Sequence, residues 1–77
     1  MPLFHFHLRS GNALFEDRRG GAFADLRAAS DWAAHDVRML ILDGVVDATL
    51  ADVWIEITDE HGVLLTTLTP DQARHLQ

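Results

Sequence analysis

The chain has 77 residues, no cysteine and a formal net charge of −6 at pH 7. A chain of this length forms one domain with a small core, and without cysteine it has neither disulfide bonds nor thiolate metal ligands. The acidic charge argues against general binding to nucleic acid or to a membrane surface, because both require positive charge. We therefore expect a single domain over residues 1–77. We find neither a signal-peptide pattern nor a membrane-spanning stretch, so we expect a cytoplasmic protein.

The N-terminal residues predict a β-hairpin. Residues 3–9 alternate in character, which is typical of a strand with two different faces. One face carries Phe4, Phe6 and Leu8, and the other carries Leu3, His5 and His7. Residues 10–12 have turn composition, and residues 13–17 predict a second, shorter strand. Residues 18–21 then break the pattern and lead toward a helix.

Residues 25–44 predict the main helix of the domain. Apolar residues recur there at three- and four-residue steps, which gathers them into one stripe. The stripe consists of Leu26, Ala29, Ala33, Val37 and Leu40. Asp25 can cap the first turn, and Gly44 stands where a left-handed residue ends a helix.

The C-terminal part predicts a second hairpin and a short helix. A connection over residues 45–52 shows no clear period. Residues 53–58 alternate, with Val53, Ile55 and Ile57 on one face and Trp54, Glu56 and Thr58 on the other. Residues 59–62 form a turn closed by Gly62, and residues 63–68 form the fourth strand. Thr69, Pro70 and Gln72 then have the pattern of a capped helix start.

The order strand, strand, helix, strand, strand predicts a two-layer α+β domain. One helix covers one face of a four-stranded antiparallel sheet. The strand order 2-1-3-4 makes every neighbouring pair antiparallel, and we prefer it for that reason. The expected core consists of Phe6, Leu8, Ala33, Val37, Leu40, Ile55 and Ile57, with Phe4 and Val53 on the same inner face.

Several short patterns occur in a characteristic order. An aromatic-aromatic-His-Leu pattern in residues 4–8 precedes a turn with Gly11, and an Asp-x-x-Gly follows at residues 17–20. An alanine-rich helix over residues 26–40, a Trp-containing strand over residues 54–58 and a second Asp-x-x-Gly at residues 59–62 complete the series. In this order, the chain resembles a family of small proteobacterial proteins classed as a domain of unknown function.

The resemblance implies the fold and supplies no catalytic residues. Two features depart from the family pattern. Arg18 and Arg19 fill the first Asp-x-x-Gly, where acidic residues are usual, and Trp32 and Met39 are unusual on the helix.

The strongest metal-ligand pattern lies on the first strand. His5 and His7 share one strand face, and Glu56 could join them if the third strand pairs with the first. These residues could equally be half-exposed polar groups on the outer side of a sheet. Two ligands do not define a site, so we assign no metal and no other cofactor.

Other polar clusters are typical of turns. Residues 18–21 precede a helix N-terminus, which can attract anions, but their spacing fits no phosphate-binding loop. Asp17 and residues 59–62 are interpreted as turn formers. No Ser/His/Asp set has the context of a nucleophile, and so small an interior leaves little room for a desolvated pocket. We therefore expect no enzyme activity.

Aromatic residues outside the expected core indicate an interaction surface. Trp54 must face away from the helix if Ile55 faces it, together with His5 and His7. Trp32 and Met39 lie beside the core stripe of the helix. We expect a non-enzymatic interaction module that forms a homodimer through its uncovered sheet face or a sheet edge. The alternatives are a regulatory or antitoxin-like protein that binds a specific partner chain and, less favoured, a His-based metal-binding protein.

Overall fold

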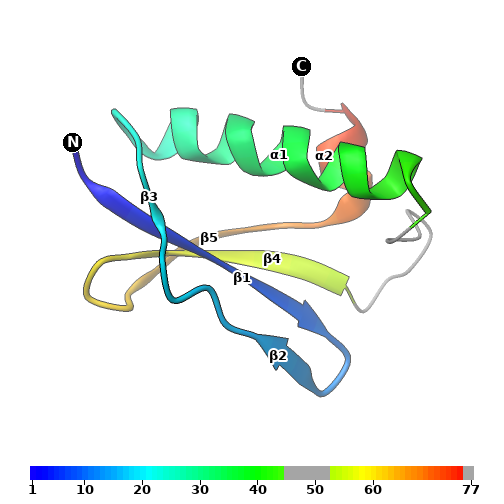
Figure 1. Ribbon diagram of the computed structural model, residues 1–77, viewed down its shortest axis with the longest axis horizontal. Coiled ribbons are helices and arrows are strands. Elements are labelled where there is room, and N and C mark those ends of the chain that lie inside the picture. Colours follow the sequence, from blue (N-terminus) through cyan, green and yellow to red (C-terminus); the bar gives the residue numbers. More distant parts are fainter. Residues whose placement is uncertain (45–52, 76–77) are drawn as a thin grey trace.

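The computed structural model describes residues 1–44 and 53–75, without the side chains of Leu40, Ile41, Arg74 and His75. The described chain forms five strands and two helices (Figure 1). In chain order they are β1 (Leu3–Ser10), β2 (Ala13–Phe15), β3 (Gly21–Ala22), α1 (Leu26–Leu42), β4 (Val53–Asp59), β5 (Leu64–Leu68) and α2 (Pro70–His75). Both helices lie on one side of the sheet, which gives the domain two layers.

The sheet has the order β2-β1-β4-β5, and all of its pairs are antiparallel. This confirms the predicted fold class and strand order. The two-residue strand β3 was not predicted and pairs with the start of β1. The second strand is shorter than predicted, because β2 ends at Phe15 and does not reach Asp17. The edge of β1 between its pairings with β2 and β3 therefore has no strand partner among the described residues.

The main helix begins and ends as the sequence indicates. The Asp25 carboxylate accepts a hydrogen bond from the Ala28 N–H at 2.8 Å, which caps the first turn. Gly44 follows the last turn with φ +77°, a conformation that costs glycine little. Of the described helices, none is both long and apolar enough to cross a membrane.

Side-chain caps also fix the C-terminal hairpin and α2. The Asp59 carboxylate accepts the Val63 N–H at 2.9 Å, and Gly62 takes φ +82° within this turn. Thr69 and Gln72 cap α2 reciprocally: the Gln72 N–H donates to Thr69 Oγ1 at 3.1 Å, and the Thr69 N–H donates to Gln72 Oε1 at 2.9 Å. Two backbone donors that the short helix cannot satisfy are thereby paired.

The core lies between α1 and the inner face of the sheet. Ile57 lies at its centre and is the largest side chain that is fully buried among the described residues. Alanines on α1 let the helix lie close to the sheet, and α2 contacts α1 beside it. The buried cluster consists of Phe4, Ala29, Ala33, Ala34, Val37, Ile55, Ile57, Leu68 and Ala73.

Two residues of the expected core are less buried than predicted. Phe6 and Leu8 face α1 but are only half-buried, because they line a pocket that is open to solvent. Alternation along β1 correctly predicts that Phe6 and Leu8 face the helix, but it does not predict how much of each side chain the helix covers. The expected burial of Leu40 and the connection over residues 45–52 lie outside the described part of the chain.

Candidate functional site

Most of the predicted site residues lie on the sheet face opposite the helices, here called the outer face. The register of β1 and β4 sets His7 opposite Glu56 and Arg9 opposite Trp54, with His5 two residues before His7. Directly opposed residues of antiparallel strands project from the same face. The structure thus brings together the histidines, Glu56 and Trp54, and all four are half-buried.

The carboxylate of Glu56 is engaged within the outer face. Its Oε2 accepts hydrogen bonds from Arg9 Nε–H and from Trp54 Nε1–H, each at 3.1 Å. The ion pair is partly exposed and contributes little to stability. The Glu56 carboxylate does hold the indole of Trp54 in place, and Arg9 balances the negative charge of Glu56.

Asp17 organises the turn between β2 and β3. Its Oδ2 accepts the Phe6 N–H at 3.1 Å, and its Oδ1 accepts the Arg19 and Gly20 N–H groups, each also at 3.1 Å. The carboxylate therefore continues the hydrogen bonding of β1 where β2 has ended. The interpretation of Asp17 as a turn former is correct, because it bonds to Arg19 and Gly20. Its bond to Phe6 in β1 could not be predicted from neighbouring residues, because Phe6 is distant in the sequence.

These bonds set the charge of Asp17. Burial raises the pKa of its carboxyl, but hydrogen bonds from the backbone N–H groups of Gly20, Phe6 and Arg19, together with the nearby His5 ring, outweigh it. The net effect lowers the pKa below its ordinary value. Asp17 is therefore a carboxylate at neutral pH, and its negative charge is committed to backbone donors.

The two histidines hold the same turn from the outer face. Asp17 O can only accept, so the His5 Nδ1 at 2.9 Å from it carries a proton and donates. The Asp17 N–H can only donate, so the His7 Nδ1 at 3.0 Å from it is unprotonated and accepts. His7 Nε2 then carries the proton and donates to Thr58 Oγ1 at 3.3 Å. The rings are stacked, with an interplanar angle of 4°.

This arrangement occupies both ring nitrogens of His7 and leaves only Nε2 of His5 without a bond among the described residues. Within that part of the chain, no three His, Cys, Asp or Glu residues are grouped as metal ligands. Binding of a metal by His7 would require that ring to give up one hydrogen bond.

We therefore expect no stoichiometric zinc, nickel or iron in protein purified without a polyhistidine tag. Changing both His5 and His7 to Ala should alter the free energy of unfolding by no more than about 1–2 kcal/mol, the worth of their hydrogen bonds. Elemental analysis and urea denaturation measure the two quantities. One tightly bound metal per chain that disappears in the double variant would contradict this expectation.

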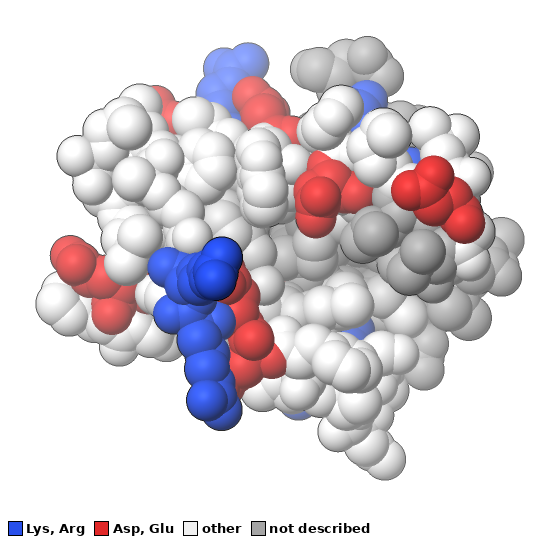
Figure 2. Space-filling model, in the orientation of Figure 1, with Lys and Arg blue, Asp and Glu red and all other residues white. Residues whose placement is uncertain are grey.

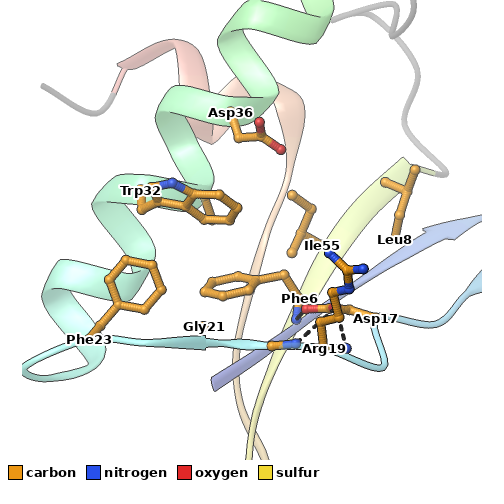
Figure 3. Close-up of a pocket in the computed structure, with 11 residues that line it drawn as sticks. Phe6, Leu8, Asp17, Arg19, Gly21, Phe23, Trp32, Asp36 and Ile55 are labelled. Atoms are coloured by element: carbon orange, nitrogen blue, oxygen red, sulfur yellow. Dashed lines mark hydrogen bonds between the residues drawn. The ribbon is translucent and has the colours of Figure 1, made fainter. Parts of the chain in front are cut away.

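A pocket of about 440 Å³ lies on the other side of the sheet, between α1 and the turn that Asp17 organises. Its walls are Phe6, Leu8 and Ile55 from the sheet, Trp32, Ala33 and Asp36 from α1, and residues of the segment 17–23 (Figure 3). The small interior predicted little room for a desolvated pocket, and this pocket is open to solvent. The pocket exists because α1 covers only part of the inner face of the sheet next to β1.

Trp32 belongs to this pocket, whereas Met39 does not. The Trp32 ring lies 5.0 Å from the Phe6 ring and 5.7 Å from the Phe23 ring, measured between centroids, yet Trp32 remains 46% exposed. Met39, two turns further along α1, is 44% exposed. The prediction that both lie beside the core stripe is correct, and the contact of Trp32 with Phe23 could not be inferred from spacing.

Comparison with known proteins identifies the class of this domain. The model of a family described as a domain of unknown function, DUF6894, matches residues 3–69. The chain belongs to this family. Searches among curated proteins and among solved structures gave no significant match.

Membership of DUF6894 agrees with the family class that the sequence resemblance indicated. The matched range runs from the first residue of β1 to Thr69, which caps α2. It therefore includes the whole sheet, α1, the outer face and the pocket. The family is a domain of unknown function, and the outer face and the pocket are the two surfaces of this chain that could bind a partner or ligand.

Proposed function

We propose that this domain is a non-enzymatic interaction module that self-associates as a homodimer through the outer face and the adjoining edge of β5. A chain without cysteine suits a reducing compartment such as the cytoplasm. The observation that carries the proposal is a run of three exposed aliphatic residues at the free edge of the sheet.

The run consists of Val63, Leu64 and Leu65, which are 56%, 54% and 39% exposed. β5 ends the described sheet, and its sequence LLTTL contains no charged residue. Proteins that remain monomeric usually protect an edge strand with charge, proline or a covering segment. Of these three, the described part of the chain places none at β5.

The outer face continues this apolar edge toward the centre of the sheet. Leu64 lies opposite Thr58, and Thr58 accepts the hydrogen bond from His7. Trp54 lies further along the same face. Its indole N–H donates to Glu56, and the charge of Glu56 is already balanced by Arg9. Tryptophan surrounded by paired polar groups is typical of the centre of an interface.

Size measurement in solution tests this proposal. We expect the wild type to be dimeric at about 100 μM and Leu64→Lys to be monomeric, because lysine at an edge strand places an unpaired charge in the contact. Trp54→Ser should also weaken the dimer. Analytical ultracentrifugation, with circular dichroism to confirm folding, measures both effects.

Leu42→Lys is the matched control, because Leu42 is 78% exposed at the end of α1, in the helical layer. It should leave the dimer unchanged. A monomeric wild type would overturn self-association and favour the alternative, a regulatory protein that binds a specific partner chain. A dimer lost only in Leu42→Lys would place the interface on the helical layer.

A further inference from the structure

The pocket beside α1 combines an apolar interior with two separate charged groups. Phe6, Phe23 and Trp32 form its aromatic end, and Leu8 and Ile55 form its floor. Its volume of about 440 Å³ lies within the range of small-molecule sites. Because Trp32 is nearly half exposed, part of its ring is left for a ligand to cover.

The two charges lie on opposite walls. In Figure 3 the Asp36 carboxylate projects from α1 into the pocket, and the Arg19 side chain rises from the opposite turn. Figure 2 shows arginine side chains in the lower part of one face with acidic side chains directly beside them, and further acidic side chains higher up. Asp36 and Arg19 line one pocket without pairing with each other.

Neither charge is used elsewhere in the described residues. Neither takes part in the ion pairs of Arg9 with Glu56, Arg18 with Glu16, or His61 with Glu60. Asp17, the other charged residue of the pocket, is committed to three backbone N–H groups. The charges that a ligand would meet are therefore one carboxylate and one guanidinium.

This balance selects the class of ligand. A simple anion would meet Arg19 but also Asp36, in a protein of net charge −6. A simple cation would meet Asp36 and the ring of Trp32 but also Arg19. A molecule with an ammonium group, a carboxylate and an apolar body satisfies both charges and fills the interior.

We propose that this pocket binds a hydrophobic zwitterion, of which an aromatic α-amino acid is the simplest member. The ammonium group lies at Asp36, one helical turn from Trp32, and the carboxylate accepts hydrogen bonds from the Arg19 guanidinium. The apolar side chain lies against Trp32, Phe6 and Ile55. This inference is independent of self-association, because the pocket and the outer face lie on opposite sides of the sheet.

The two tryptophans provide a test with an internal control. Nuclear magnetic resonance resolves one indole N–H signal for Trp32, in the pocket, and one for Trp54, on the outer face. L-Phenylalanine should shift the Trp32 signal saturably, with a dissociation constant on the order of 0.1–1 mM, and leave the Trp54 signal in place. 2-Phenylethylamine and 3-phenylpropanoate, which each keep only one charge, should bind several-fold more weakly.

Charge variants test the assigned contacts. Asp36→Asn and Arg19→Gln should each weaken L-phenylalanine binding about three- to tenfold, the worth of one charge-assisted hydrogen bond at a half-open site. Arg18→Gln and Asp31→Asn change exposed neighbours that do not line the pocket and should have no more than about a twofold effect.

Three results would overturn the proposal. The first is no saturable shift at Trp32 up to about 10 mM ligand, well above the expected dissociation constant. The second is equal binding of all three probes, which would make the pocket a purely apolar site. The third is equal loss in the pocket variants and their neighbours. None depends on the oligomeric state, so failure here is distinguishable from failure of the dimer.

Discussion

Ile57→Ala is expected to lower the free energy of unfolding by about 2–5 kcal/mol. Ile57 is fully buried, between α1 and the sheet, and lies opposite Phe6 and Thr66 in the strand pairing. Its truncation removes apolar contacts and leaves a cavity that a close-packed alanine-rich helix cannot fill. A domain of this size has only about 4–12 kcal/mol of stability in total, so the variant should be near the unfolding threshold.

Urea denaturation followed by circular dichroism measures this effect. Leu42→Ala is the control, because Leu42 is 78% exposed in the helical layer, away from the proposed dimer contact, and the variant should lose less than about 1 kcal/mol. Ile57→Val should fall between them, at about 0.5–1.5 kcal/mol. Equal losses for Ile57→Ala and Leu42→Ala would mean that Ile57 does not lie at the centre of the core.

Asp17→Ala is expected to cost about 1–3 kcal/mol at neutral pH. The change removes the acceptor of three backbone N–H groups, and the N–H of Phe6 then has no partner at the edge of β1. The cost is smaller than for Ile57, because the Arg19 and Gly20 N–H groups can be hydrated more easily at the surface.

The variant should also change the dependence of stability on pH. The pKa of Asp17 is lowered in the folded state, so the stability that its charge confers is present above the unfolded pKa of about 4 and is lost as pH falls through the folded pKa. The difference in unfolding free energy between wild type and Asp17→Ala should therefore shrink between pH 5 and about pH 2.

Taking the difference between two proteins removes the contribution of the other acidic groups. Asp31→Ala, on the exposed side of α1, should follow the wild-type pH dependence. If the unfolding free energies of wild type and Asp17→Ala changed with pH in parallel, the ionised Asp17 carboxylate would not be stabilised by its hydrogen bonds in the folded state.

Local signals in the sequence were sufficient for most of the fold. Asp25 and Gly44 bracket α1 because their side-chain and backbone preferences act on adjacent residues. Thr69 and Gln72 gave the start of α2 for the same reason. Alternation determined which face each residue of β1 and β4 occupies, and the requirement for antiparallel neighbours then determined the strand order.

Features that depend on distant residues were missed. β3 has only two residues, too few for a periodic pattern, and it forms because the turn at Asp17 returns the chain to β1. Gly20 contributes to that turn: it has φ +68°, and a Cβ atom there would lie 2.6 Å from Phe4 O. The Asp-x-x-Gly pattern was the available signal, but it does not indicate which strand the carboxylate reaches.

The pocket was missed for a related reason. A stripe of apolar residues predicts the direction of a helix face, but the width of the sheet that the face covers depends on side-chain sizes on both layers. The small residue Ala33 lies next to Trp32 on α1, and the gap beside them stays open above Phe6 and Leu8. Sequence spacing alone cannot give this volume.

The unequal edges of the sheet have a consequence for how an assembly of this domain would grow. At the β1 side, β2 has only three residues, and beyond it the Asp17 carboxylate occupies a backbone donor that another strand would need. At the β5 side, a five-residue strand lacks charge. Within the part of the chain that the structure describes, each copy thus has one edge, that of β5, to which another strand could add. Two copies joined across β5 by a two-fold axis would use up both such edges, so the process terminates at a pair and does not propagate into a fibril.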